Sequence, residues 1–338
     1  MSSIIVAGAT GAIGRAVVQH AIRQPSIGRV VALTRSANIS AANYADLFGV
    51  VAADAAAGNG GGGGASAAGT VVATAEEVAK ITPVTMDWEA FTRLWATNRS
   101  TTALEPYSGL FSGHAYAAMC LGTTRKDAGS ADKFTRCDYD YVMAFTEAVL
   151  AYSAPAGLSP ASVFVRHIGD KGSGAAAAAD GAGTPTTIAS SGTLRVFCQV
   201  SASGASSGSW FLYMKTKGLA DESTVERVHQ HNQLAAAAAQ SPVRLVVLLP
   251  GLLERHGKTR TNEKVAKLFV SAIPVGTCGA AIVAASVQTP ATEAPPGKPY
   301  TVSKALRKSG APAHEPLAHI YQVHNAGIKE LAARLPAP

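Results

Sequence analysis

Aromatic and charged residues are both scarce in this 338-residue chain. Phe, Trp and Tyr make up 6% of the sequence, and Asp, Glu, Lys and Arg make up 15%. The formal net charge is +7, yet no block of five or six Lys or Arg residues occurs, and the few aromatics indicate no platform for stacking bases. Direct binding of nucleic acid is therefore the weakest interpretation, and a mildly basic protein with an anionic ligand is the favoured one.

Cysteine is also scarce, and its positions argue against a zinc site or a disulfide framework. The four cysteines include no C-x-x-C pair. His229 and His231 lie close together, but no acidic or cysteine partners complete a metal pattern, so we expect a pair on a helix surface and no bound metal. The cysteines are Cys120, Cys137, Cys198 and Cys278.

Long apolar runs are absent too. No run approaches the length that spans a bilayer, and the first predicted strand begins at Ser3 or Ile4, which leaves no room for a signal peptide. We therefore expect a reducing, soluble compartment. The cytoplasm is the favoured location and the nucleus is the alternative.

Large apolar side chains are few in two Gly- and Ala-rich stretches, at 52–69 and at about 153–192. Such stretches bury too little area to offset the entropy lost when the backbone is ordered, so we predict flexible insertions. Without them, the chain has about the size of one α/β domain with a small C-terminal cap.

Strand and helix patterns alternate along the rest of the chain. Apolar runs predict strands at 4–7, 29–34, 81–86, 115–121, 194–200 and 244–249, and helical spacing predicts helices at 12–23, 133–152 and 213–231. This alternation predicts an α/β fold with a doubly wound parallel sheet and helices on both faces. We assign residues 1–250 to this domain with both insertions, and 251–338 to its C-terminal, substrate-side region.

A G-x-x-G-x-x-G turn follows the first predicted strand and opens the first predicted helix. Glycine permits positive φ angles and close approach of a backbone to a pyrophosphate, and the helix start presents free N–H groups to an anion. This context predicts a nicotinamide-dinucleotide site of the Rossmann type, with a purely structural turn as the alternative. The residues expected to line the pyrophosphate are Gly8, Thr10, Gly11, Ala12, Ile13 and Gly14.

The end of the second predicted strand favours NADPH over NADH. It reads Leu33-Thr34-Arg35, with no Asp or Glu at the place that would bind a ribose 2′-hydroxyl. An arginine there can bind a 2′-phosphate instead, and Arg15 could add to that contact. The alternative is that Arg35 is a solvated residue at the strand end.

Tyr213 and Lys217 form a Y-x-x-x-K pair on one face of a predicted helix. A free phenol, with a pKa of about 10, exchanges protons poorly at neutral pH, and a nearby ammonium favours the phenolate. The pair therefore suits proton exchange with a carbonyl oxygen during hydride transfer, and Lys217 could also bind the nicotinamide ribose. Tyr300 and Lys304 share the spacing, but they lie in a Pro-rich stretch beyond the sixth strand.

A serine near the end of the fifth predicted strand is expected to polarise the carbonyl. Ser203 lies past the strand end, where its side chain could point into a cleft, and we prefer it. Ser201 is the alternative. Either residue could instead be a solvent-facing loop serine.

Several further segments occur in one order from the first to the sixth strand, and with the glycine turn they resemble the Tat-interacting, metastasis-suppressor oxidoreductase-like proteins. These proteins are atypical or extended short-chain dehydrogenases/reductases. The most specific segment is L-G-T-T-R at 121–125. The others are 86–88 (M-D-W), 128–129 (A-G), 137–142 (C-D-Y-D-Y-V), 211–213 (F-L-Y), 217–218 (K-G) and 250–251 (P-G).

The resemblance implies an NADPH-binding Rossmann domain in which Tyr213 and Lys217 are the catalytic pair. It also implies that the cofactor is contacted by Asp87 at the adenine, by Leu121, Gly122 and Thr123 along the dinucleotide, and by Pro250. Two departures matter: the family's paired serines read Ser201-Ala202 here, and Leu249 replaces the usual arginine before Pro-Gly.

Simpler interpretations exist for some of these residues. Asp87 could cap the following helix, since Asp is a good N-cap. Thr123 and Thr124 could be loop residues that satisfy strand-end amides. Asp138 and Asp140 are expected to be solvated or helix-starting acids.

Together the patterns predict an NADPH-dependent reductase of a small carbonyl compound. Family members also act as regulatory binding proteins, so the alternative is a non-enzymatic, NADPH-sensing protein that binds other proteins. The substrate pocket is expected to form mainly from the C-terminal third, where Leu253, Glu254 and His256 are candidates.

Overall fold

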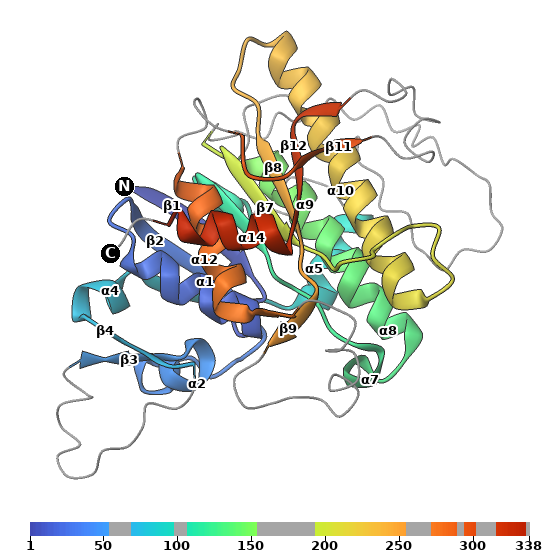
Figure 1. The fold of residues 1–338 in the computed structure, drawn as a ribbon. Coiled ribbons are helices and arrows are strands. Elements are labelled where there is room, and N and C mark those ends of the chain that lie inside the picture. Colours follow the sequence, from blue (N-terminus) through green and yellow to red (C-terminus); the bar gives the residue numbers. More distant parts are fainter. Residues whose placement is uncertain are drawn as a thin grey trace.

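A central sheet with helices on both faces forms the core of the protein (Figure 1). The computed structural model describes residues 1–53, 69–97, 107–153, 193–254, 272–288, 294–301 and 316–335. The eight-stranded sheet is parallel except at one edge strand, which confirms the predicted α/β fold class. The two predicted insertions lie mainly at 54–68 and 154–192, outside the described residues.

The strand order is β11-β12-β8-β7-β6-β1-β2-β5. From β1 the chain builds outward through β2 to β5, and it then returns to the other side of β1 to add β6, β7 and β8. In open α/β sheets ligands bind beyond the carboxyl ends of the strands where this order reverses. The bounds are β1 Ser2–Ala7, β2 Ile27–Thr34, β5 Ile81–Thr85, β6 Tyr116–Met119, β7 Val196–Val200, β8 Arg244–Leu249, β11 Lys298–Thr301 and β12 Pro316–His324.

Two separate cores cover the two faces of this sheet. Along β1, the side chains of Ile4 and Val6 enter one core and those of Ile5 and Ala7 enter the other, because successive strand residues point to opposite faces. Burial on both faces explains why the strands read as continuous apolar runs. The first core is covered by α1 (Ala12–Arg23), α12 (Val275–Val287) and α14 (Asn325–Ala333), and the second by α5 (Trp88–Thr97), α9 (Tyr141–Tyr152) and α10 (Leu212–Ala237).

The patterned elements lie close to their predicted positions. The bounds of α1 and β8 agree with the sequence prediction, and α10 runs six residues further than predicted, to 237. The predicted helix at 133–152 consists of α8 (Ala131–Thr135), a π-helical turn (Arg136–Asp140) and α9. Smaller elements are a 3₁₀ turn (Ala41–Asn43), α2 (Tyr44–Phe48), β3 (Val50–Ala52), β4 (Val71–Ala73), α4 (Ala75–Ala79), α7 (Arg125–Ala128), β9 (Leu252–Glu254) and β10 (Ala272–Pro274).

The C-terminal third contributes more than the expected small cap. Strand β12 pairs in parallel with β8, and β11 pairs antiparallel with β12 at the edge of the sheet. Helix α12 packs between α1 and α14. At the α1–α12 crossing, a Cβ on Gly279 would lie 2.5 Å from that of Ala16, so the two helices approach at a glycine. Much of this region is therefore part of the main fold.

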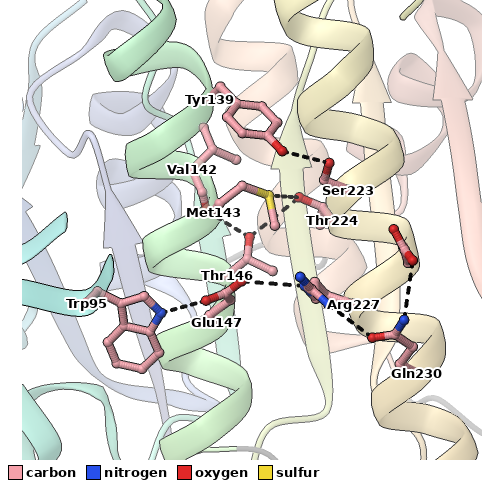
Figure 2. A network of polar contacts seen from close by, with 11 residues as sticks. Trp95, Tyr139, Val142, Met143, Thr146, Glu147, Ser223, Thr224, Arg227 and Gln230 are labelled. Carbon is pink, nitrogen blue, oxygen red and sulfur yellow. Dashed lines mark hydrogen bonds and ion pairs between the residues drawn. The ribbon is translucent and has the colours of Figure 1, made fainter. Parts of the chain in front are cut away.

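Buried polar contacts fasten α10 to α9 and α5 (Figure 2). The indole Nε1 of Trp95 donates to Oε2 of Glu147 at 2.6 Å, and Nε of Arg227 lies 3.4 Å from Oε1 of the same carboxylate. The hydroxyls of Thr146, which precedes Glu147, and of Thr224, one turn before Arg227 on α10, are 3.5 Å apart. These contacts set the position of α10, the helix that carries the Tyr–Lys pair.

We expect Glu147→Leu to lower the free energy of unfolding by about 3 kcal/mol, because Trp95 and Arg227 both lose this buried carboxylate as a partner. Urea unfolding followed by circular dichroism measures the change. The control is Arg136→Ala, which breaks a pair with Glu89 whose side chains are 51% and 45% exposed, and should cost about 1 kcal/mol or less. Equal effects of the two substitutions would contradict this account of the network.

Candidate functional site

The residues expected to bind the cofactor or substrate follow the carboxyl ends of six parallel strands. Gly8 comes after β1, Arg35 after β2, Asp87 after β5, Leu121 after β6, Ser203 after β7 and Pro250 after β8. Because these strands are parallel, all six positions lie along one edge of the sheet. The structure thus gathers most of the predicted site, with Tyr213 and Lys217 entering from the start of α10.

The glycine turn is tightly closed around the backbone of Gly8. This residue has φ +75°, and a Cβ there would lie 2.8 Å from the carbonyl carbon of Cys120 at the end of β6. A Cβ on Gly14 would lie only 2.0 Å from the Gly8 oxygen, which also accepts the N–H of Gly11 at 2.9 Å. The turn therefore requires glycine at positions 8 and 14 for steric reasons.

The N-terminus of α1 is suited to an anion. Gly11 is the N-cap, no side chain caps this end, and the first turn of α1 holds no acidic residue. Such a helix start presents backbone N–H groups and a partial positive charge. A pyrophosphate is the kind of group this end of α1 can bind.

The two arginines near the turn have different surroundings. Arg15 donates from Nε to the carbonyl of Thr10 at 3.2 Å and from its guanidinium to the carbonyl of Asp46. It is thus tied to the backbone, which weakens the suggestion that it binds a 2′-phosphate. Arg35 is exposed directly after β2. Burial raises the pKa of Cys137 to about 11, and the positive charges of Lys217 and Arg35 act in the opposite direction.

Asp87 acts as a helix cap. Its Oδ1 accepts the N–H of Ala90 at 3.0 Å in the first turn of α5, and the residue is exposed. Capping employs one carboxylate oxygen, so contact of the other with an adenine is compatible with this geometry.

The loop after β6 is linked to α10 through Asp138. The backbone N–H of Thr123 donates to Oδ2 of Asp138 at 2.9 Å, and Nζ of Lys217 lies 2.8 Å from Oδ1. A Cβ on Gly122 would lie 3.2 Å from that Nζ, so the ammonium sits against the loop backbone. Lys217 is thereby held where the dinucleotide path was predicted.

The expectation that Asp138 and Asp140 are solvated is wrong, because both are buried. The alternative that they start a helix agrees with their positions, since Asp138 lies in the first turn of the π-helical segment and Asp140 directly precedes α9. Asp138 lies in the π-helical turn, and its carboxylate is compensated by Lys217 and Thr123. A signal was present in the sequence: Val142, Phe145 and Val149 follow Asp138 at helical spacing and form an apolar face. An acid on such a face needs a partner, which the sequence alone did not identify.

The ammonium of Lys217 is stabilised in its charged form. Burial by itself lowers the pKa of Lys217, but Asp138, Tyr213 and Asp221 together raise it above the ordinary value. Tyr213 lies one turn earlier on α10, is 37% exposed, and its ring centroid is 5.8 Å from that of Phe134 in α8. The site thus combines an accessible phenol with a buried cation.

The two candidate serines differ sharply. Ser201 is buried and donates its hydroxyl proton to Asp221, which also accepts from Nε2 of Gln199 at 2.8 Å. Ser203 is exposed, and its backbone N–H donates to the carbonyl of Pro250 at 2.8 Å. A hydroxyl has a single proton, so the commitment of Ser201 to Asp221 favours Ser203 as the hydrogen-bond donor to a substrate.

Asp221 is a buried carboxylate that sequence reasoning missed. Burial raises its pKa to about 6, although Ser201, Lys217 and Gln199 act in the opposite direction. It lies four residues after Lys217, one turn further along α10. That spacing was the available signal in the sequence. Only the folded structure shows that Asp221 contacts Gln199 in β7 and Ser201 directly after it.

Other candidates fall elsewhere. Tyr300 lies in the edge strand β11, while Lys304 and His256 are outside the described residues.

The expectation of a surface histidine pair is wrong for His231, which is buried on the face of α10 that also carries Val228 and Ala235. Among the described residues, no three His, Cys, Asp or Glu side chains are grouped as a metal ion would require.

Within the same ranges, no helix combines the length and the apolar character needed to cross a bilayer.

The parallel sheet, the glycine turn and the Tyr–Lys pair define an α/β protein of Rossmann type, similar to the short-chain dehydrogenases/reductases. No protein-family model matches the chain.

The particular resemblance is to Protein HTATIP2 of Rattus norvegicus, which confirms the likeness seen in the sequence motifs. The identity is 28% over 172 residues, or 51% of this chain. The chain therefore spans about half of that relative, 49% of its length.

Solved structures of similar fold include two with high coverage. UDP-glucuronic acid 4-epimerase from Bacillus cereus in complex with NAD is 12% identical with a TM-score of 0.44, and it covers 99% of this chain and 91% of its own. A short chain dehydrogenase from Burkholderia cenocepacia J2315 in complex with NADP is 11% identical with a TM-score of 0.43, covering 91% of each chain.

Asp221 predicts a specific pH dependence of stability. Its folded pKa of about 6 lies above the ordinary value of 3.8, so the folded state favours the protonated form. The associated stability is fully present below pH 3.8 and is lost as the pH rises through 6. Relative to wild type, Asp221→Asn should therefore gain up to about 3 kcal/mol between pH 4 and 7.

Urea unfolding of both proteins at each pH measures this difference. The matched control is Asp132→Asn, which removes an exposed carboxylate from α8 and should show no comparable trend. A difference between Asp221→Asn and wild type that stays constant with pH would rule out the burial of a titrating carboxylate at this position.

Proposed function

We propose that this protein binds NADPH and reduces a small carbonyl compound. The observation that carries the proposal is the position of the Lys217 ammonium, held by Asp138 against Gly122 and one helical turn from the accessible phenol of Tyr213. An ammonium at this place can bind a ribose hydroxyl and stabilise a phenolate at the same time.

The residues at the sheet edge fit a dinucleotide. The cradle at Gly8 and Gly14 excludes side chains, and the start of α1 offers backbone N–H groups to a pyrophosphate. Further contacts are proposed for Asp87 at the adenine, for Leu121, Gly122 and Thr123 along the loop after β6, and for Pro250 after β8. Thr10, Ala12 and Ile13 complete the turn. Bound NADPH would supply the hydride.

The protein's own groups would manage the proton. Tyr213 would donate its phenolic proton to the carbonyl oxygen, and the ammonium of Lys217 would stabilise the phenolate that remains. Ser203 would donate a hydrogen bond to the same oxygen and polarise the carbonyl. Asp138 positions Lys217 and, through the N–H of Thr123, the loop after β6.

A non-enzymatic role is the second candidate, favoured by one observation. The family pattern has paired serines after the fifth strand, whereas this chain has Ser201-Ala202, with Ala202 buried and Ser201 bonded to Asp221. A protein that binds NADPH without turnover, and changes its binding of other proteins in response, would not need that serine.

We expect Arg35→Ala to weaken NADPH binding by about 10- to 100-fold and to leave NADH binding unchanged, because only NADPH carries the 2′-phosphate that the guanidinium would bind. Isothermal titration calorimetry with each nucleotide measures both dissociation constants. Equal affinities for NADPH and NADH in the wild type, or a preference that survives the substitution, would show that Arg35 does not select the cofactor.

We expect Tyr213→Phe to lower kcat by about 100-fold or more while NADPH binding is retained, because the phenol is the proton donor and not a cofactor anchor. The assay follows NADPH oxidation by absorbance against aldehydes, ketones and quinones. Tyr300→Phe, which alters the other Y-x-x-x-K match, is the control and should keep its activity. Binding without turnover across the panel would favour the sensor, and failure to bind either nucleotide would refute both candidates.

A further inference from the structure

Two large aromatic side chains are exposed directly before Tyr213. Trp210 is 100% exposed and Phe211 is 77% exposed, whereas Trp88 and Trp95, the chain's other tryptophans, are 2% and 0% exposed. Exposed apolar groups that are contiguous rather than scattered commonly mark a binding surface. Here they adjoin the proposed proton donor.

The loop that presents these side chains is held in place on α10. A Cβ on Gly218 would lie 2.2 Å from the carbonyl carbon of Ser206, so the loop backbone rests directly on the helix. The N–H of Ser206 donates to the carbonyl of Met214 at 3.0 Å, and the hydroxyl of Ser207 donates to Glu222 at 2.7 Å. A loop fixed in this way prevents the aromatic pair from collapsing onto the protein.

The position of the pair relates it to the substrate. Trp210 is three residues from Tyr213, so their Cα atoms are at most about 11 Å apart, within the length of a medium-sized organic molecule. Ser203, the proposed hydrogen-bond donor, belongs to the same loop. Residues 201–214 contain no Asp, Glu, Lys or Arg. This loop therefore provides no positive charge that would bind a carboxylate or phosphate group of a substrate.

We propose that Trp210 and Phe211 bind the apolar part of the substrate, whose class is therefore neutral carbonyl compounds that carry a long aliphatic or large aromatic group. This inference rests on the proposed reductase function and specifies its substrate. Covering about 60 Å² of the aromatic surface would improve affinity about tenfold. A bound apolar chain would also shield Trp210 from water.

Trp210 is a built-in reporter, because it is the one tryptophan of the three that solvent can reach. The experiment measures acrylamide quenching of tryptophan fluorescence in the full chain with NADP⁺ present, so that no reduction occurs. The probes are acetone, 2-hexanone and 2-decanone. We expect 2-decanone to shield Trp210, acetone to leave it open, and the dissociation constant to fall as the chain lengthens.

The variants separate the aromatic pair from general apolar binding. Phe211→Ala should weaken 2-decanone binding about tenfold, and Trp210→Ala should have the same effect. Because Trp210→Ala lacks the fluorescent reporter, its 2-decanone binding is measured by calorimetry. Leu234→Ala is the matched control: Leu234 is an apolar residue 44% exposed near the far end of α10, and its removal should change nothing.

Three results would overturn the inference: equal shielding by acetone and 2-decanone, 2-decanone affinity unchanged in both aromatic variants, or shielding that grows with protein concentration without ketone, which indicates contact between copies. Failure of the reductase function is distinguishable. Shielding by 2-decanone without any NADPH oxidation would keep the binding surface and refute the reductase. NADPH oxidation that acetone and 2-decanone support equally, and that Trp210→Ala leaves unchanged, would keep the reductase function and refute the binding surface.

Discussion

The ion pair between Asp138 and Lys217 is the contact on which the candidate site depends. It joins two helical segments on the same face of the sheet, and through the N–H of Thr123 it also fixes the loop after β6. Removing both charges from water is unfavourable, and only close geometry with additional hydrogen bonds offsets that cost. Here the carboxylate has both an ammonium and a backbone amide as partners. The same contact therefore sets the position of the predicted catalytic lysine and of the predicted dinucleotide path.

A second carboxylate, that of Asp221, lies near Lys217, and the two acids have different partners. Asp138 pairs with the ammonium directly, whereas Asp221 receives hydrogen bonds from Ser201 and Gln199 and has a raised pKa because of its burial. One cation cannot fully compensate two buried anions, so the acid without the direct pair is the one that tends toward the neutral form. Ser201 is thereby drawn into the support of α10 and away from the substrate side.

The two sides of the site have opposite character. Toward the glycine turn, the start of α1 and Arg35 provide backbone dipoles and positive charge, as an anionic cofactor requires. Toward the loop before α10, the chain is uncharged and exposes Trp210 and Phe211. Tyr213 lies between these regions, where a hydride donor and an apolar carbonyl compound would meet. The rigid attachment of α10 to α9 through Glu147 keeps that position constant (Figure 2).

The sequence by itself determined the elements whose signals are local. The glycine turn was predictable because a positive φ at Gly8 and close backbone approaches at Gly8 and Gly14 admit no side chain. The central strands β1, β2, β6, β7 and β8 were predictable because burial on both faces demands continuous apolar runs. Tertiary structure decided the partners of Asp138, the role of Ser201 and the addition of β12 to the sheet. Each of these depends on contact between segments distant in sequence, and no local pattern encodes which distant group compensates a buried charge.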